Sequence, residues 1–246
     1  MKIGLTERGD ASVDYGWVSK MDSVDGAVLI TKNITPKFID TVLPFKDKVI
    51  VHATTTGFGG TVLEPNVPDF KTEIHNMKAL MDRGVPANHI VLRIDPIIPT
   101  EKGLAAASEV FMQAVKQGLW RIRISVIDMY PHVRDRFTQA GLPLPFNGFQ
   151  ASDAQMLAVD AMVQRWKAAC PNAEICCCAE PRLKGPIQQG CISPIDLTIL
   201  GLHNEESLAT GFQRKGCLCL SCKTELLTER HQCPHGCLYC YWKDNT

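Results

Sequence analysis

The chain has 246 residues, of which 45% are apolar and 21% charged, with 26 basic and 26 acidic side chains. This composition predicts a globular core and excludes a disordered or collagen-like chain, while the zero net charge excludes a global basic field for nucleic acid. The first residues turn polar before the apolar stretch of a signal peptide could form, and no run of about 18 apolar residues occurs. We therefore expect a cytoplasmic protein that does not associate with a membrane.

Six short runs rich in aliphatic and β-branched residues alternate with helical patterns. The predicted strands are Lys2–Thr6, Gly26–Thr31, Lys48–Thr55, His89–Ile94, Arg121–Ile127 and Glu174–Cys178. The predicted helices are Pro36–Leu43, Phe70–Arg83, Gly103–Gln117, Ala151–Ala169 and Ser193–Leu202. Such alternation predicts parallel pairing through right-handed crossovers, in a doubly wound sheet or an open partial barrel. Beyond residue 202 we expect loops held by metal rather than by a core.

Polar or charged residues follow each of the six predicted strands. Ligands of parallel α/β folds bind outside the carboxyl ends of the strands, so these residues predict a polar mouth. Arg93 and Asp95 are the most informative, because buried charges within an apolar strand persist chiefly when paired or functional. The alternative is that such residues only cap and solvate the strand ends. The candidate catalytic residues are Arg93, Asp95, Asp128 and Glu180, and the candidate contacts to cofactor or substrate are Asn33, Thr54, Thr56, Arg93 and Ser125.

All 11 cysteines lie from Cys170 onward. A reducing compartment disfavours structural disulfides, and the odd number leaves at least one thiol unpaired. Metal binding is therefore the leading interpretation of the C-terminal third of the chain.

The clearest motif is Cys233-Pro-His-Gly-Cys237-Leu-Tyr-Cys240, with the spacing C-x3-C-x2-C. This spacing, with an aromatic residue before the last cysteine, is the motif of radical S-adenosylmethionine enzymes. Three thiolates hold a 4Fe–4S cluster whose open iron binds S-adenosylmethionine, and one electron then cleaves the cofactor to a 5′-deoxyadenosyl radical. We expect Tyr239 near the adenine. The alternative is a zinc knuckle with His231 or His235 as the fourth ligand.

Four further cysteines could ligate a second, auxiliary 4Fe–4S cluster: Cys178, Cys191, Cys217 and Cys219. The alternative is that Cys176, Cys177 and Cys178 simply continue a buried strand, where cysteine behaves as a small hydrophobic residue. In that strand Cys176 and Cys178 would share one face and Cys177 the other.

Several segments of the chain, in one order, resemble a known family. They are Thr6-Glu7-Arg8-Gly9-Asp10, Ile30-Thr31-Lys32-Asn33, Glu64-Pro65-Asn66-Val67-Pro68, Arg93-Ile94-Asp95-Pro96-Ile97, Ser125 to Tyr130, Cys178-Ala179-Glu180, Cys191, Cys217-x-Cys219 and the C-terminal motif. They resemble the uncharacterised bacterial radical-SAM-like proteins related to spore photoproduct lyase, whose cysteine motif lies at the C-terminus.

The resemblance implies a (β/α)6 partial TIM barrel over residues 1–190, with a cluster-binding extension over residues 191–246 packed on its mouth. It implies hydrogen abstraction leading to rearrangement or bond formation on an unidentified substrate, of isomerase or lyase type. By analogy the first substrate to consider is a thymine-like base, free or in DNA, as in base hypermodification, with a flavodoxin- or ferredoxin-like electron donor. The competing classes are a zinc-stabilised nucleic-acid-binding module and a two-cluster electron-transfer protein.

Overall fold

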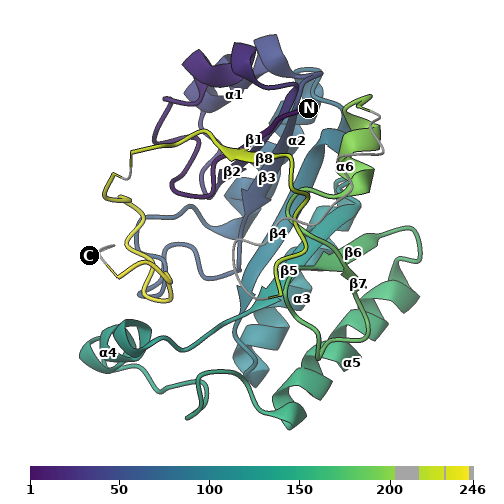
Figure 1. The fold of residues 1–246 in the computed structure, drawn as a ribbon. Coiled ribbons are helices and arrows are strands. Elements are labelled where there is room, and N and C mark those ends of the chain that lie inside the picture. The colour runs from purple at the N-terminus through teal and green to yellow at the C-terminus, as the bar shows by residue number, and fades with distance from the viewer. Residues whose placement is uncertain (203–215, 230, 244–246) are drawn as a thin grey trace.

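The computed structural model describes residues 1–202, 216–229 and 231–243 of the chain (Figure 1). One parallel sheet runs through the molecule, with the strand order β7-β6-β5-β4-β3-β2-β1-β8. Its strands are β1 Ile3–Leu5, β2 Gly26–Thr31, β3 Val49–Thr54, β4 Ile90–Ile97, β5 Arg121–Val126, β6 Glu174–Cys177, β7 Ile187–Gln188 and β8 Lys223–Glu225. The α-helices are α1 Pro36–Val42, α2 Phe70–Asp82, α3 Glu101–Lys116, α4 Pro131–Gln139, α5 Asp153–Ala169 and α6 Pro194–Ile199, and short 3-10 turns cover Val18–Ser23, Leu43–Phe45 and Ala87–His89.

The six predicted strands are confirmed as parallel neighbours in sequence order. The five predicted helices are also present, and their first residues follow from capping. Thr35 accepts a hydrogen bond from the Phe38 amide, and Pro36 occupies the first helical position. The third predicted helix begins at Glu101 rather than at Gly103, because Thr100 caps it by accepting from the Gly103 amide.

The outer face of the sheet is apolar and covered by helices. Alternate strand residues such as Leu29, Val51, Leu92 and Ile124 belong to one buried cluster that also contains residues of α1, α2, α3 and α5. Burial of each such side chain contributes roughly 1.5–3 kcal/mol, so this face carries most of the apolar stabilisation. The arrangement of these helices around the strands can be followed in Figure 1.

The inner face of the same strands is partly charged. It carries His52 of β3, Arg93 of β4, and Arg121 and Arg123 of β5, all at the positions that alternate with the outer core. Helix α6 docks on this face through Asp196, which is fully buried. Its carboxylate lies 2.6 Å from Arg121 Nη2 and 3.1 Å from Arg123 Nη2. The inner face is therefore held by buried ion pairs as well as by apolar contacts.

Helix α4 and strands β7 and β8 were not predicted, because the sequence of each has only a weak pattern of apolar residues. Helix α4 is a polar segment in which Val133 and Phe137 are buried one turn apart. Strand β7 has two exposed residues. Strand β8 lies where only loops were expected, and it pairs with β1 through backbone bonds from Ile3 to Cys222 and from Leu226 to Leu5. Part of the residue 191–246 segment thus joins the main sheet.

Among the helices of the described part of the chain, none combines the length and the apolar character that crossing a membrane requires.

Candidate functional site

Residues 231–243 lie against the carboxyl ends of the strands (Figure 1). Asn66, in the loop after β3, donates to the Pro234 carbonyl at 2.8 Å, and the Leu238 amide donates to Leu63. Arg136 of α4 donates to the Cys240 carbonyl at 2.7 Å and to the Trp242 carbonyl at 2.7 Å. The segment with the three motif cysteines is thereby fixed at the edge of the sheet where parallel α/β proteins bind ligands.

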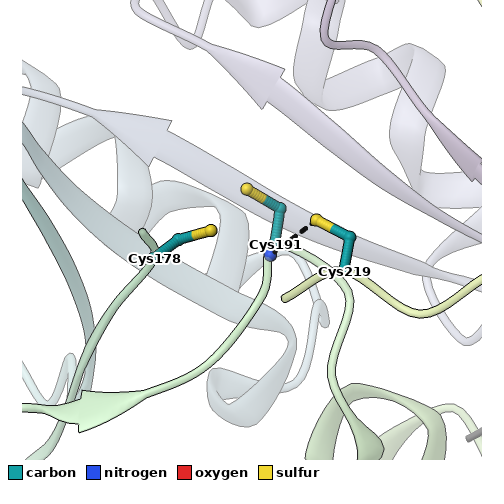
Figure 2. A group of neighbouring side chains, drawn as sticks. All are labelled: Cys178, Cys191 and Cys219. Carbon is teal, nitrogen blue, oxygen red and sulfur yellow. Dashed lines mark hydrogen bonds between the residues drawn. The ribbon is translucent and has the colours of Figure 1, made fainter. Parts of the chain in front are cut away.

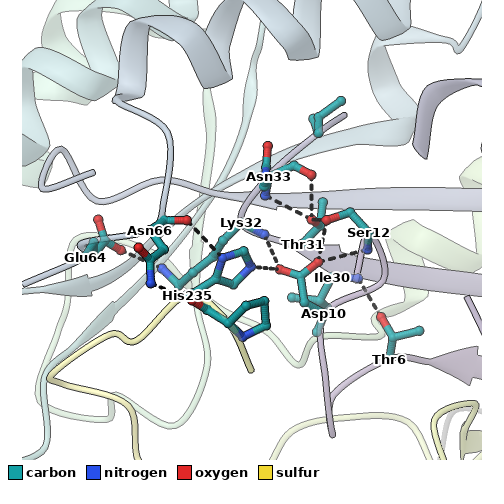
Figure 3. A network of polar contacts seen from close by, with 12 residues as sticks. Thr6, Asp10, Ser12, Ile30, Thr31, Lys32, Asn33, Glu64, Asn66 and His235 are labelled. Carbon is teal, nitrogen blue, oxygen red and sulfur yellow. Dashed lines mark hydrogen bonds and ion pairs between the residues drawn. The ribbon is translucent and has the colours of Figure 1, made fainter. Parts of the chain in front are cut away.

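His235, between the first two motif cysteines, is bound to the body of the protein (Figure 3). Its Nε2 lies 2.8 Å from an Asp10 carboxylate oxygen, and its Nδ1 lies 3.4 Å from the Asn66 carbonyl oxygen. The Asp10 carboxylate also accepts from the Lys32 amide at 2.7 Å. Burial raises the pKa of Asp10, but the hydrogen bond and charge of His235 outweigh it and hold that pKa below its ordinary value. Both ring nitrogens of His235 thus face oxygen acceptors.

Tyr239 is held by a buried ion pair at the end of β2. Lys32 Nζ lies 2.8 Å from Glu64 Oε1 and 2.7 Å from the Tyr239 hydroxyl, which itself donates to Glu64. Thr56 donates to the second Glu64 oxygen at 2.6 Å. Burial opposes both charges, yet the pair lowers the pKa of Glu64 and raises that of Lys32. Two predicted cofactor contacts, Thr56 and Tyr239, therefore meet on one carboxylate.

The three motif thiols lie near one another at this edge. Cys237 is buried, and Cys233 and Cys240 are half-buried. Burial raises the pKa of Cys237 to about 12; the Lys32 ammonium opposes this rise, while Glu64 and the other two thiols add to it. Cys233, Cys237 and Cys240 all belong to the described part of the chain, and their three sulfur atoms do not all lie within 4.8 Å of one another.

A second group of predicted residues lies at the carboxyl ends of β4 and β5. Arg93 forms an ion pair with Asp95, and the Ser125 hydroxyl donates to the same carboxylate. Burial would raise the pKa of Asp95, but the Arg93 guanidinium holds it below its ordinary value. Thr54 is the residue paired with Arg93 on the neighbouring strand. The structure therefore brings these four predicted residues together on the inner face.

The other three predicted site residues, Glu180, Asp128 and Asn33, lie outside the group formed by Arg93, Asp95, Ser125 and Thr54. Glu180 accepts from the Val126 amide at 2.8 Å, and burial, with a contribution from Asp128, raises its pKa to about 7. The Asp128 carbonyl accepts from the Tyr130 amide at 3.1 Å. The Asn33 amide donates to Thr31 Oγ1 at 3.0 Å, at the end of β2 (Figure 3).

Three of the four cysteines expected to form an auxiliary site converge (Figure 2). The sulfur atoms of Cys178, Cys191 and Cys219 all lie within 4.8 Å of one another, and the Cys191 amide donates to Cys219 Sγ at 3.3 Å. Cys217 is buried but lies outside this thiol group. Cys177 packs in the outer core, as strand alternation requires.

Sequence reasoning did not single out His52, Arg123 or Glu64 as site residues. It placed Asp10 and Lys32 among the polar residues at the strand ends but assigned them no catalytic or cofactor role. His52 and Arg123 share the signal that singled out Arg93, a titratable residue alternating with apolar ones in a strand. The other three lie in segments that carry the family resemblance, but their partners are far away in sequence.

Fold and site together define a parallel α/β protein with a thiol-rich, charged inner sheet face. The chain belongs to the family described as "Domain of unknown function (DUF1848)", whose model matches residues 13–242. The search of the curated proteins found no match to this chain.

Proposed function

We propose that the protein is a radical S-adenosylmethionine enzyme in which Cys233, Cys237 and Cys240 hold the 4Fe–4S cluster. The observation that carries this proposal is the position of the motif segment, which lies at the carboxyl edge of a parallel sheet beside the charged inner face. When bound, the cluster and its cofactor supply a 5′-deoxyadenosyl radical for hydrogen abstraction.

The donor set of the motif fits a three-thiolate cluster better than zinc. Zinc needs four ligands, and the candidate fourth ligands were His231 and His235. Both nitrogens of His235 already face Asp10 and Asn66, while His231 is 62% exposed and lies 3.7 Å from Asp14. A cubane places each thiolate on a different iron and so needs sulfurs farther apart than a single ion does. The looser spacing of these three sulfurs agrees with a cubane.

The strand order supports the partial barrel. A doubly wound sheet reverses its strand order and carries helices on both faces, whereas β1 to β6 follow one another without reversal. The four crossover helices α1, α2, α3 and α5 share the outer core. We propose that residues 1–190 form the (β/α)6 partial barrel and that residues 191–246 include the segment that covers its mouth.

The inner-face residues have distinct roles in this proposal. Arg93, oriented by Asp95, presents a guanidinium to a carboxylate or carbonyl oxygen of the cofactor or substrate. Ser125 and Thr54 complete this polar surface. Lys32 and Glu64 position Tyr239 beside Cys237, so that the ring closes the cluster site against water.

The substrate proposal rests on the family resemblance. It is a thymine-like base, free or within DNA, rearranged by an isomerase or cleaved in a lyase-type reaction after reduction by a flavodoxin- or ferredoxin-like donor. None of the eleven cysteines, which all lie in the described part of the chain, forms a disulfide, and this suits a reducing cytoplasm.

The test is cofactor cleavage by the anaerobically purified full chain, reduced with dithionite. We expect about four iron and four sulfide per cluster, and methionine plus 5′-deoxyadenosine as products. Cys237→Ala should reduce cleavage to the background rate, because it removes one cluster ligand. Cys170→Ala is the matched control, since Cys170 caps the end of α5 away from both thiol groups.

Circular dichroism and thermal unfolding of both variants show whether the sheet stays intact. Cleavage retained by Cys237→Ala, or zinc without sulfide at this motif in the wild type, would overturn the proposal. Iron and sulfide without cofactor cleavage would favour an electron-transfer protein instead.

A further inference from the structure

We propose that Cys178, Cys191 and Cys219 form a second metal centre, which binds a single tetrahedral divalent ion of the zinc class. The three thiols come from the end of β6, from the loop between β7 and α6, and from the segment before β8 (Figure 2). None of them belongs to the C-x3-C-x2-C motif, so this proposal stands or falls independently of the radical chemistry.

The spacing of the sulfur atoms favours one ion over a cluster. Zinc–sulfur bonds of about 2.3 Å in a tetrahedron place neighbouring sulfur atoms about 3.8 Å apart. The three sulfur atoms here all lie within 4.8 Å of one another, so small side-chain rotations complete the geometry.

The charges around the thiol group favour thiolates. Arg123 of β5 is paired with Cys176 of β6, two residues before Cys178, and Lys223 follows Cys219 by four residues. Binding of a divalent ion releases the protons of the three thiols and leaves a centre with one net negative charge, which these cations balance.

We propose His52 as the fourth ligand. Its ring nitrogens, like the Cys217 sulfur, are not among the atoms that lie within 4.8 Å of one another, so its side chain must move toward the three thiols when the ion binds. His52 is fully buried on the inner face, and neither ring nitrogen has a hydrogen-bond partner among the described residues. Arg123 Nε and Nη1 also lack hydrogen-bond partners in the described structure. Their N–H groups can donate hydrogen bonds to metal-bound thiolates. A metal centre would satisfy all of these buried groups at once.

The proposed role of the ion is to clamp three separate segments onto the inner face. Gly190 shows how closely two of them approach, because a Cβ atom there would lie 2.4 Å from the Cys219 backbone nitrogen. The segment carrying Cys219 continues into β8, which pairs with β1. An ion at this point fixes the C-terminal segment to the sheet before the motif cysteines are reached.

The first experiment measures zinc, iron and sulfide in the anaerobically purified full chain and in single variants. We expect about one zinc per chain, bound by wild type, Cys170→Ser and Cys237→Ala and lost in Cys191→Ser and Cys219→Ser. Unchanged zinc in Cys191→Ser would overturn the site. Loss of about four iron and four sulfide instead would overturn the single ion in favour of an auxiliary cluster.

A cobalt titration keeps the proposal testable if Cys191→Ser does not fold. Added to metal-free Cys237→Ala, one equivalent of Co²⁺ should give the intense visible bands of tetrahedral thiolate cobalt, and Zn²⁺ should abolish them. Absence of these bands would overturn the centre. His52→Ala should weaken cobalt binding by more than about 10-fold and shift the bands. Unchanged bands and affinity would overturn the assignment of His52 as a ligand.

Discussion

The two faces of the sheet are built from the same strands but use different interactions. On β4 and β5 the outer positions are Leu92, Ile94, Ile122 and Ile124, all buried under helices. The positions between them carry Arg93, Asp95, Arg121, Arg123 and Ser125. A shift of one residue along a strand therefore separates a packing surface from a polar one. The comparison teaches that the outer face packs against the helices, while the inner face carries the polar and charged groups of the candidate site.

The charged residues of the inner face are stabilised by ion pairs and hydrogen bonds at two separate places. Where α6 covers it, Asp196 accepts from two arginines and from the amide and hydroxyl of Ser193. Where the candidate site lies, Arg93 and Asp95 pair with each other. Such pairs add little net stability but are costly to break where the remaining partner is left charged and fully buried, as at Asp196. The side chains of Arg93 and Asp95 are 17% and 25% exposed, so breaking their pair costs less.

The largest effect on stability should come from Asp196→Ala. Removal of this carboxylate leaves Arg123 with no ion-pair partner among the described residues and leaves Arg121 only the longer pair to Glu174, at 3.4 Å. We therefore expect a loss of about 3–5 kcal/mol in the free energy of unfolding. The matched control is Asp153→Ala, whose side chain is 91% exposed and pairs with Arg182 at 3.3 Å. That change should cost at most about 1 kcal/mol in urea unfolding. Equal losses in the two variants would mean that the inner face does not depend on this triad.

Adjacent residues of β4 offer the sharpest test of the two faces. Leu92→Ala removes a fully buried outer side chain and should cost about 2–5 kcal/mol, with cofactor cleavage per folded molecule unchanged. Arg93→Ala should do the reverse, impairing turnover more than stability. The measurements are urea unfolding and product formation under saturating cofactor. A loss of folding in Arg93→Ala as large as in Leu92→Ala would mark Arg93 as half of a structural ion pair.

Much of the fold could be predicted because its signals are local. Buried parallel strands appear as short aliphatic runs, and helices such as α1 begin at a cap like Thr35 followed by Pro36. Strand β8 could not be predicted, because Lys-Thr-Glu has no apolar pattern and depends on β1, more than 200 residues away. Its pairing is a property of the tertiary structure.

The candidate site was predicted from local motifs, from strand-end positions and from the cysteines, but most contacts between its distant residues were not predicted. Arg93 and Asp95 are two positions apart, and the motif cysteines lie within eight residues. The hydrogen bond between His235 and Asp10 joins residues 225 positions apart, and no local sequence pattern indicates that they are neighbours. Among the other cysteines, only the geometry separates Cys219, which joins the thiol group, from Cys217, which does not.

One buried carboxyl in the outer layer should make the free energy of unfolding depend on pH. Glu73 of α2 is fully buried, and burial raises its pKa to about 7, although the Ile34 amide opposes this. The unfolded pKa is lower, so this group favours folding in acid, and the favourable contribution is lost as pH rises from about 4.5 to about 7. The total loss is about 3 kcal/mol.

Glu73→Gln should abolish that dependence. The stability of the variant relative to wild type, from urea unfolding, should rise by about 2–3 kcal/mol between pH 5 and pH 8. A constant difference across this range would show that Glu73 keeps the same charge in the folded and unfolded chains.

The smallest expected effect tests whether the outer helices act only through stability. Thr35→Ala removes the side-chain acceptor for the Phe38 amide, at 3.0 Å, and should cost about 1 kcal/mol of unfolding free energy. Thr41→Ala, later in the same helix, is the control, because its hydroxyl only donates to the Lys37 carbonyl within the helix. Neither change should alter cofactor cleavage per folded molecule, since α1 packs on the outer core and not on the inner face. A drop in cleavage beyond the loss of folded protein in Thr35→Ala would mean that the outer layer also positions the site, through the nearby end of β2.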